Sequence, residues 1–160
     1  MKYFIRKAQI EDISKIAAIY NSNSQFLQHH AGYEHVSTEW IAEELQSMKA
    51  SGFSSFVILE ESSQKVIGII EYQMAETAYL SLLMLDYEQQ GKRIGQEIYK
   101  LFEEKVKQNH CCKIRIDVVN DYSPNVVGFW EKQGFVAVET ILLTWGEKTS
   151  SALIMTKDLE

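Results

Sequence analysis

The sequence predicts a mixed α/β fold of the α+β type, in which a central sheet of about seven strands carries helices on both faces. Strand-like and helix-like segments follow the order β-α-α-β-β-β-α-β-α-β-β along the chain. Its 160 residues, 46% of them hydrophobic and 24% charged, suit one globular domain over residues 1–160. Consecutive strand-like segments in the middle of the chain exclude a Rossmann order and a TIM barrel, since both place helices between successive parallel strands.

The N-terminal third predicts one strand and two helices. Tyr3–Ala8 is strand-like, and Glu11–Tyr20 places its apolar residues at helical spacing. The polar, turn-rich stretch that follows is either a loop or a loosely helical segment, and it reads NSNSQFLQHHAG. The second helix begins with Ser37 or Thr38 as its N-cap and ends near Gly52.

The middle of the chain predicts a hairpin, a buried strand and an amphipathic helix. Two strand-like runs flank the polar stretch ESSQ and form the hairpin, FSSFVILEE and KVIGIIEYQM. The next run, AYLSLLML, is almost continuously apolar, which is typical of a central strand covered on both faces. The helix after it presents one apolar stripe, made of Ile94, Ile98, Leu101, Phe102 and Val106.

The C-terminal third predicts further strands around a short helix. The run KIRIDVV alternates as a strand does. The short helix starts with Ser123 as its N-cap and Pro124 at its first position, and it ends at Gly134 as a left-handed residue. Phe135–Thr140 and Leu153–Lys157 are strands, and ILLTWGEKTSSA between them adds more strand and a turn.

Charge and composition exclude several classes of protein. The net charge of −6 and the absence of a basic stripe argue against nucleic-acid binding, and slightly favour cationic partners such as amines. No apolar run approaches the ~18 residues of a membrane helix. The start, MKYFIRKAQIED, is no signal peptide, so we expect a cytoplasmic protein. The adjacent Cys111 and Cys112 predict two reduced thiols, and no spacing indicates a metal site.

The stretch EQQGKRIGQ, residues 88–96, joins the buried strand to the amphipathic helix. Such a junction leaves unpaired backbone N–H groups at a helix N-terminus, which favours phosphate. Gly91 and Gly95 let the backbone approach a ligand, and Lys92 and Arg93 add positive charge. The alternative is a helix start with a solvated basic turn. Neither GxxxxGK[ST] nor GxGxxG is present, which argues against a Walker loop and a dinucleotide fingerprint.

This loop, together with FWEKQGF at Phe129–Phe135, resembles two hallmarks of the GNAT superfamily of acetyl-CoA-dependent N-acetyltransferases. The order of elements resembles that family over essentially the whole chain. The resemblance implies that the loop cradles the pyrophosphate of coenzyme A and that the end of the preceding strand pairs with pantetheine. The residues it assigns to the cofactor are Leu83, Met84, Leu85, Gln90, Gly91, Lys92, Arg93, Ile94, Gly95, Gln96, Asn125 and Trp130.

Two residues depart from the family pattern. Arg93 replaces the first glycine of the loop motif, and a positive φ there would strain an arginine. Trp130 stands where many relatives have a tyrosine that protonates the leaving thiolate, and an indole N–H does not give up its proton. Trp130 either packs against pantetheine or is a plain core aromatic. Tyr122 is a substitute acid, and water is the alternative.

The resemblance indicates where relatives place the proton acceptor and the acceptor pocket, and residue types at those places suggest candidates. Glu71, on the strand before the central one, is the nearest carboxylate to serve as a general base, and its alternative is a surface-facing strand glutamate. The loop residues expected to line an amine pocket are His29, His30, Tyr33 and Glu34. Adjacent histidines in a polar loop are alternatively exposed side chains without chemistry.

The leading hypothesis is therefore an enzyme that moves an acetyl group from acetyl-CoA to a primary amine by direct attack in a ternary complex, without a metal. The acceptor is a small molecule or a peptide amine. The alternatives are a non-catalytic acyl-CoA-binding or sensing domain and a purely structural α/β domain. The apolar runs ILLTW and ALIM fit either a homodimer edge or a buried sheet.

Overall fold

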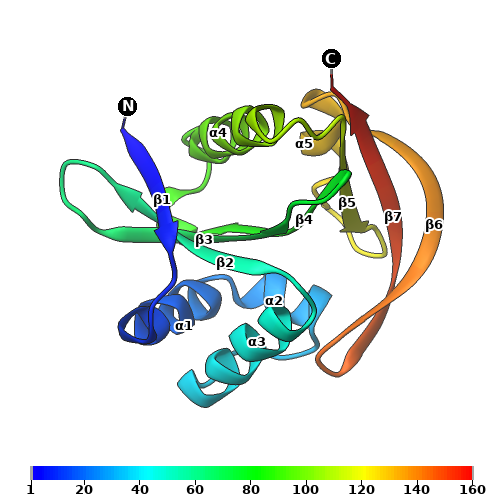
Figure 1. Ribbon diagram of the computed structural model, residues 1–160. Coiled ribbons are helices and arrows are strands. Elements are labelled where there is room, and N and C mark those ends of the chain that lie inside the picture. Colours follow the sequence, from blue (N-terminus) through cyan, green and yellow to red (C-terminus); the bar gives the residue numbers. More distant parts are fainter. Residues whose placement is uncertain (1, 160) are drawn as a thin grey trace.

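A seven-stranded mixed sheet runs through the middle of the molecule with helices on both faces, as the sequence predicts (Figure 1). The computed structural model describes residues 2–159. The strand order is β1-β2-β3-β4-β5-β7-β6, and the neighbours are antiparallel except for the parallel pair β4 and β5. The strands are β1 (Tyr3–Lys7), β2 (Ser54–Glu60), β3 (Val66–Gln73), β4 (Thr77–Leu85), β5 (Lys113–Val119), β6 (Val136–Trp145) and β7 (Lys148–Asp158).

The helices form two layers, one on each face of the sheet (Figure 1). One layer contains α1 (Ile13–Ser22), α2 (Ser24–His30) and α3 (Thr38–Ala50). The other contains α4 (Ile94–Gln108) and α5 (Val127–Lys132). Each layer covers its own apolar core, and β3 and β4 contribute residues to both cores, which explains their nearly continuous apolar sequence. No helix within residues 2–159 is both long and apolar enough to cross a membrane.

The polar stretch after α1 is a defined helix, α2, where the sequence left a loop or a loosely helical segment open. Leu27 anchors this helix because its side chain is fully buried, and its N–H donates to the Asn23 carbonyl at 3.0 Å. The following helix, α3, starts as predicted, with the Ser37 hydroxyl accepting from the Trp40 N–H at 3.0 Å. Both helices therefore lie against the same face of the sheet.

The predicted start of the short helix at Ser123 and Pro124 is wrong, since α5 begins at Val127. The side chain of Asn125 provides the reason, because its Oδ1 accepts a hydrogen bond from the Val127 N–H at 3.0 Å. Val126 is the N-cap residue of α5, and Asn125 directly before it supplies the side-chain acceptor at this helix start. The predicted end is confirmed, with Gly134 at a φ of +100°.

Candidate active site

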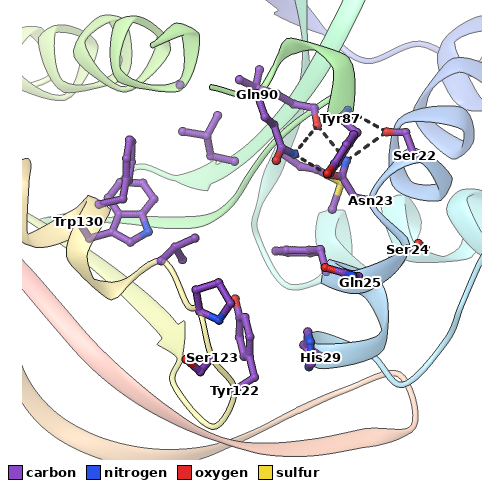
Figure 2. Close-up of a pocket in the computed structure, with 18 residues that line it drawn as sticks. Ser22, Asn23, Ser24, Gln25, His29, Tyr87, Gln90, Tyr122, Ser123 and Trp130 are labelled. Atoms are coloured by element: carbon purple, nitrogen blue, oxygen red, sulfur yellow. Dashed lines mark hydrogen bonds between the residues drawn. The ribbon is translucent and has the colours of Figure 1, made fainter. Parts of the chain in front are cut away.

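A cleft of about 590 Å³ opens where β4 parts from β5, and it extends to α2 (Figure 2). The two strands pair only at Thr77, Ala78 and Tyr79 of β4. Beyond Tyr79 the end of β4 has no β5 partner, which leaves room between the strands. The cleft is lined by Ser22, Asn23, Ser24, Gln25, Phe26, His29, Leu83, Met84, Leu85, Tyr87, Gln90, Gly95, Tyr122, Ser123, Pro124, Val126, Phe129 and Trp130.

A smaller hollow of about 400 Å³ lies at the start of α4, and we call it the cradle. Its lining consists of Leu85, Gln89, Gln90, Gly91, Arg93, Ile94, Gly95, Gln96, Phe129, Lys132 and Gln133. Four of these residues also line the cleft: Leu85, Gln90, Gly95 and Phe129. The cradle and the cleft therefore form one continuous depression that runs from α4 to α2.

The backbone of the cradle is rich in free hydrogen-bond donors. Within residues 2–159, the N–H groups of residues 91–96 have no hydrogen-bond partner, and the first bond of α4 runs from the Glu97 N–H to the Arg93 carbonyl at 3.3 Å. Gly91 has a φ of +77°, and a Cβ built there would meet nothing within 4 Å. These donors, with the positive end of a 15-residue helix behind them, suit an anion such as a phosphate group.

Arg93 occupies the strained position that the sequence analysis identified. Its φ is +64° and its ψ is 13°, a left-handed conformation that costs a non-glycine residue about 1 kcal/mol or more. The strain places a guanidinium at the cradle, where Lys132 of α5 adds a second positive charge. The predicted backbone geometry of a glycine is thus kept by an arginine.

Asn23 is a buried residue whose hydrogen bonds link the elements around the cleft. In the sequence, only the polarity of its segment points to it. Its Nδ2 donates to the carbonyls of Ile19 and Leu85, both at 2.9 Å, and its Oδ1 accepts from Gln90 Nε2 at 2.5 Å (Figure 2). Asn23 is buried and joins α1, the end of β4 and the cradle by direct hydrogen bonds. The Gln90 side chain is consequently directed to Asn23.

Trp130 is a core aromatic that also reaches the cleft. Its indole is 9% exposed and packs edge-to-face on Tyr99, Phe129 and Phe135 at 5.0–5.6 Å between ring centroids. The same indole lines the cleft (Figure 2). Among the described residues, its N–H has no hydrogen-bond acceptor. Trp130 therefore closes the α5 side of the cleft.

His29 and Tyr122 form the far end of the cleft, near α2. Their rings stack with centroids 4.4 Å apart and an interplanar angle of 8° (Figure 2). Burial, followed by the nearby Asp121 carboxylate, raises the pKa of Tyr122 above its usual value. The phenol is thus protonated at neutral pH. Lys148 Nζ donates to the His29 carbonyl at 2.5 Å and fixes α2 to the β6–β7 hairpin.

The other residues predicted for an amine pocket lie outside the cleft. His30 stacks on Phe26 at 3.9 Å, its Nδ1 lies 2.9 Å from the Phe26 carbonyl, and burial lowers its pKa to about 4. Tyr33 packs against Trp40, with ring centroids 5.9 Å apart. Glu34 accepts from Gln28 at 3.0 Å. Of the four predicted residues, only His29 lines the cleft.

Glu71 is neither exposed nor part of the cleft lining. The expectation of a surface-facing glutamate is wrong, because the residue is 3% exposed and lies between the sheet and the α1–α3 layer. Its Oε2 accepts from the Ser55 hydroxyl at 2.5 Å, and burial raises its pKa to about 7. Glu71 pairs with Leu82 of β4, directly before a β-bulge between Glu71 and Tyr72.

Two residues predicted for the cofactor, Lys92 and Asn125, line neither the cleft nor the cradle. Asn125 is exposed and uses its side chain within its own loop. Asn120, at the end of β5, instead has a buried Oδ1 with no partner among the described residues. Within residues 2–159, no group of three or more His, Cys, Asp or Glu side chains could hold a metal ion.

Solved structures with this fold are numerous, and three illustrate the likeness. An acetyltransferase from Thermus thermophilus superposes with a TM-score of 0.81 at 18% identity, over 99% of this chain and 98% of its own. PaiA N-acetyltransferase from Thermoplasma acidophilum, solved with coenzyme A, gives 0.68 at 24% identity over 99% of both chains. Spermidine N-acetyltransferase from Vibrio cholerae, solved with coenzyme A and spermine, gives 0.73 at 18% over 98% and 95%. These likenesses show the fold.

A sequence relative and a family model complete the comparison. The Bacillus subtilis (strain 168) protein YdhI is 31% identical over 80 residues, which is 50% of this chain and 48% of YdhI, so the match spans about half the length of that uncharacterized relative. The model of the acetyltransferase (GNAT) domain matches residues 17–146, which include the cradle, the far end of the cleft and Trp130. The chain belongs to the GNAT acetyltransferase family.

Proposed function

We propose that this protein transfers an acetyl group from acetyl-CoA to a primary amine by direct attack of the amine in a ternary complex. The row of unpartnered N–H groups at residues 91–96, opening onto a cleft between diverging strands, carries the proposal. One end of this depression suits the phosphates of a coenzyme, and the other end leaves room for a second substrate. Membership of the GNAT family supports the same reaction.

The cradle binds the pyrophosphate in this proposal. The backbone donors of residues 91–96 and the α4 dipole hold the negative charge, and Arg93 and Lys132 add cations at its edge. Gly95 keeps the approach open, since a Cβ there would lie 3.8 Å from Leu85 and 3.9 Å from Phe129. Any larger side chain would extend into the depression that the coenzyme needs.

The end of β4 receives the pantetheine arm and orients the thioester. Beyond Tyr79 the backbone on the β5 side has no strand partner, so the segment Leu83–Leu85, apart from the Leu85 carbonyl that accepts from Asn23, offers backbone groups to the amides of pantetheine. A backbone N–H of this segment polarises the thioester carbonyl as negative charge develops on its oxygen. Acetyl-CoA supplies the activated acyl group, and the chain supplies position and polarity.

Two stacked side chains handle the protons at the far end. Tyr122 remains protonated at neutral pH because its pKa is raised, so its phenol can donate to the departing thiolate, whose reference pKa is ~8.5. His29 lines the same end and can take the proton that the attacking amine loses. Glu71 receives no role in this proposal, because it is buried outside the cleft.

A second candidate is an acyl-CoA-binding domain without catalysis. The observation that favours it is the absence of Asp and Glu from the cleft lining within the described chain, since many proton-transfer sites use a carboxylate. Both candidates share the coenzyme site and differ at the far end of the cleft.

Two measurements, made one after the other, test the proposal. Coenzyme A at millimolar concentration should raise the melting temperature, because a ligand that binds only the native state stabilises it. No shift would contradict both candidates. Thiol release from acetyl-CoA should then require both the protein and an amine. Binding without release across amino acids, peptides, aryl amines and alkyl amines would favour the sensing domain and contradict the enzyme.

A further inference from the structure

The far end of the cleft is chemically unlike the surface of this acidic protein. We define this end by Ser24, Gln25, Phe26, His29, Tyr122 and Ser123. The chain carries a net charge of −6, yet among the described residues no Asp, Glu, Lys or Arg lines any part of the cleft. A second substrate therefore meets amides, hydroxyls and aromatic rings there. The overall charge attracts any amine from a distance, but it supplies no local partner for a second cation.

Two carboxylates on the same side of the sheet, Glu44 and Glu71, already have hydrogen-bond partners. Glu44 of α3 accepts a hydrogen bond from the Trp145 indole N–H, and that indole lies 6.1 Å from the Phe26 ring, between centroids. Glu71 accepts from the Ser55 hydroxyl at 2.5 Å. Aromatic rings thus separate Glu44 from the cleft, and Glu71 is buried between the sheet and the α1–α3 layer.

Two further carboxylates near the β5–α5 loop are also engaged. Asp117 accepts from the Tyr79 hydroxyl and from Arg115 Nε and Nη2 at 2.9 and 3.0 Å. Asp121, directly before Tyr122, lies 3.4 Å from Lys148 Nζ and accepts from the Ser151 N–H at 3.3 Å. Arg115 and Lys148 thus already neutralise these two carboxylates, and neither carboxylate lines the cleft.

The aromatic rings of this end are also partly occupied. A cation can bind to the face of an aromatic ring, but His30 covers one face of Phe26 and His29 covers one face of Tyr122. The stacked rings present edges and remaining faces that suit apolar or aromatic groups. Gln25 and Ser24 offer neutral hydrogen bonds at the rim (Figure 2).

We propose that the acceptor is a monoamine with an uncharged, apolar or aromatic body, and that the cleft discriminates against polyamines and other amines with a second cationic group. This inference rests on the proposed acetyl transfer. The reacting amine can enter as a neutral group, because desolvation lowers its pKa and His29 can take its proton. A second ammonium group would be desolvated without a carboxylate partner, which is strongly unfavourable.

A matched pair of amines tests the proposal, because hexylamine and 1,6-diaminohexane differ by one terminal ammonium group. With acetyl-CoA, kcat/KM measured by thiol release should favour hexylamine by about tenfold or more. The melting temperature of the coenzyme A-loaded protein should rise with hexylamine and remain nearly unchanged with 1,6-diaminohexane. Preference for the diamine, equal turnover, or binding of neither amine would overturn the proposal.

A charge placed in the cleft sharpens the test. Gln25→Glu should shift the preference toward 1,6-diaminohexane by about tenfold, since it supplies the missing carboxylate. Gln46→Glu adds the same charge on an exposed position of α3 and should leave the ratio unchanged. An equal shift in both variants would mean that net charge sets the preference, which contradicts the proposal.

Different results would contradict the proposed acetyl transfer and the proposed preference for monoamines. Loss of thiol release with every amine, while coenzyme A still binds, contradicts the proposed acetyl transfer. The melting temperatures measured with hexylamine and with 1,6-diaminohexane do not depend on turnover. They therefore still decide whether the far end of the cleft prefers an amine with an uncharged body.

Discussion

The two ends of the cleft are built by different means. The α4 end is one continuous piece of chain, residues 91–96, whose backbone N–H groups have no protein acceptor within the described residues. The far end joins side chains from α2 and from the β5–α5 loop, held together by the stacking of His29 on Tyr122. A site made of one local segment is readable from a motif, whereas a site made by packing distant segments depends on the whole fold.

The largest expected effect comes from filling the α4 end. Gly95→Leu should weaken coenzyme A binding by at least about 100-fold, because its side chain would occupy the junction of cradle and cleft. Gly128→Leu is the matched control, since it lies on α5 and a Cβ there meets nothing within 4 Å. Titration calorimetry measures both affinities. Equal affinity in the two variants would place the coenzyme elsewhere.

Asn23 connects the two ends, so its removal should affect stability and binding together. Asn23→Ala should lower the free energy of unfolding by about 1–3 kcal/mol, since the buried Leu85 carbonyl and the Gln90 amide keep only the 3.5 Å hydrogen bond between them. Urea denaturation measures this loss, and coenzyme A affinity should fall with it. A loss comparable to that of Asn109→Ala, an exposed residue, would show that the Asn23 bridge contributes little.

Glu71 lies outside both ends, and its effect should be on stability alone. Burial raises its pKa to about 7 from 4.5, so the folded protein binds a proton that the unfolded chain releases between these values. This stability is complete below pH 4.5 and is lost as the pH rises through 7. Glu71→Gln should remove about 2 kcal/mol of this dependence between pH 5 and pH 8. Denaturation curves at each pH provide the measurement.

The activity of the Glu71→Gln variant distinguishes a general base from a buried residue that has no part in catalysis. With the residue outside the cleft, thiol release by Glu71→Gln at pH 8 should stay within about twofold of the parent. A loss of 100-fold or more without loss of coenzyme A binding would make Glu71 the general base after all.

Tyr122 belongs to the far end and should affect turnover more than coenzyme binding. Tyr122→Phe keeps the ring that stacks on His29 but removes the phenol, so kcat should fall by about tenfold while coenzyme A affinity is kept. The rate loss should shrink when a donor with a less basic thiol is used. An unchanged kcat would leave water as the proton donor.

Replacing Arg93 should have the smallest effect of these substitutions, and it should raise the stability of the fold instead of lowering it. Arg93→Gly relieves the left-handed strain at φ +64°, and after the larger backbone entropy of glycine is subtracted we expect a gain of about 1 kcal/mol or less. Coenzyme A affinity should fall moderately and become less dependent on salt, because a cation is lost from the cradle. A loss of stability would contradict the strain.

Much of the fold was predictable because hydrophobic periodicity dominates the sheet and α4. The hairpin of β2 and β3, the buried β4 and the amphipathic α4 all follow from local patterns. The start of α5 was not predictable, since Asn125 rather than Ser123 supplies the hydrogen bond. The sequence pattern at Ser123 and Pro124 is typical of a helix start, yet α5 begins three residues after Pro124.

The candidate site likewise has one part that the sequence predicts and one part that depends on the fold. The loop residues 90–96 could be named because the strand–helix junction and its glycines resemble a family motif, and all but Lys92 line the cradle. His29 and His30 are adjacent in sequence, yet one lines the cleft and the other stacks on Phe26. Which of two neighbours on a short helix faces a cavity depends on the rotation of that helix, and no local pattern reveals it.

A crystal structure of the protein with coenzyme A tests the central claim most directly, because it locates both ends of the ligand. We expect the pyrophosphate on the backbone N–H groups of residues 91–96 and the sulfur between β4 and β5, on the side of His29 and Tyr122. A coenzyme bound outside the cleft, or one with its sulfur at the cradle and its phosphates at the far end, would contradict it.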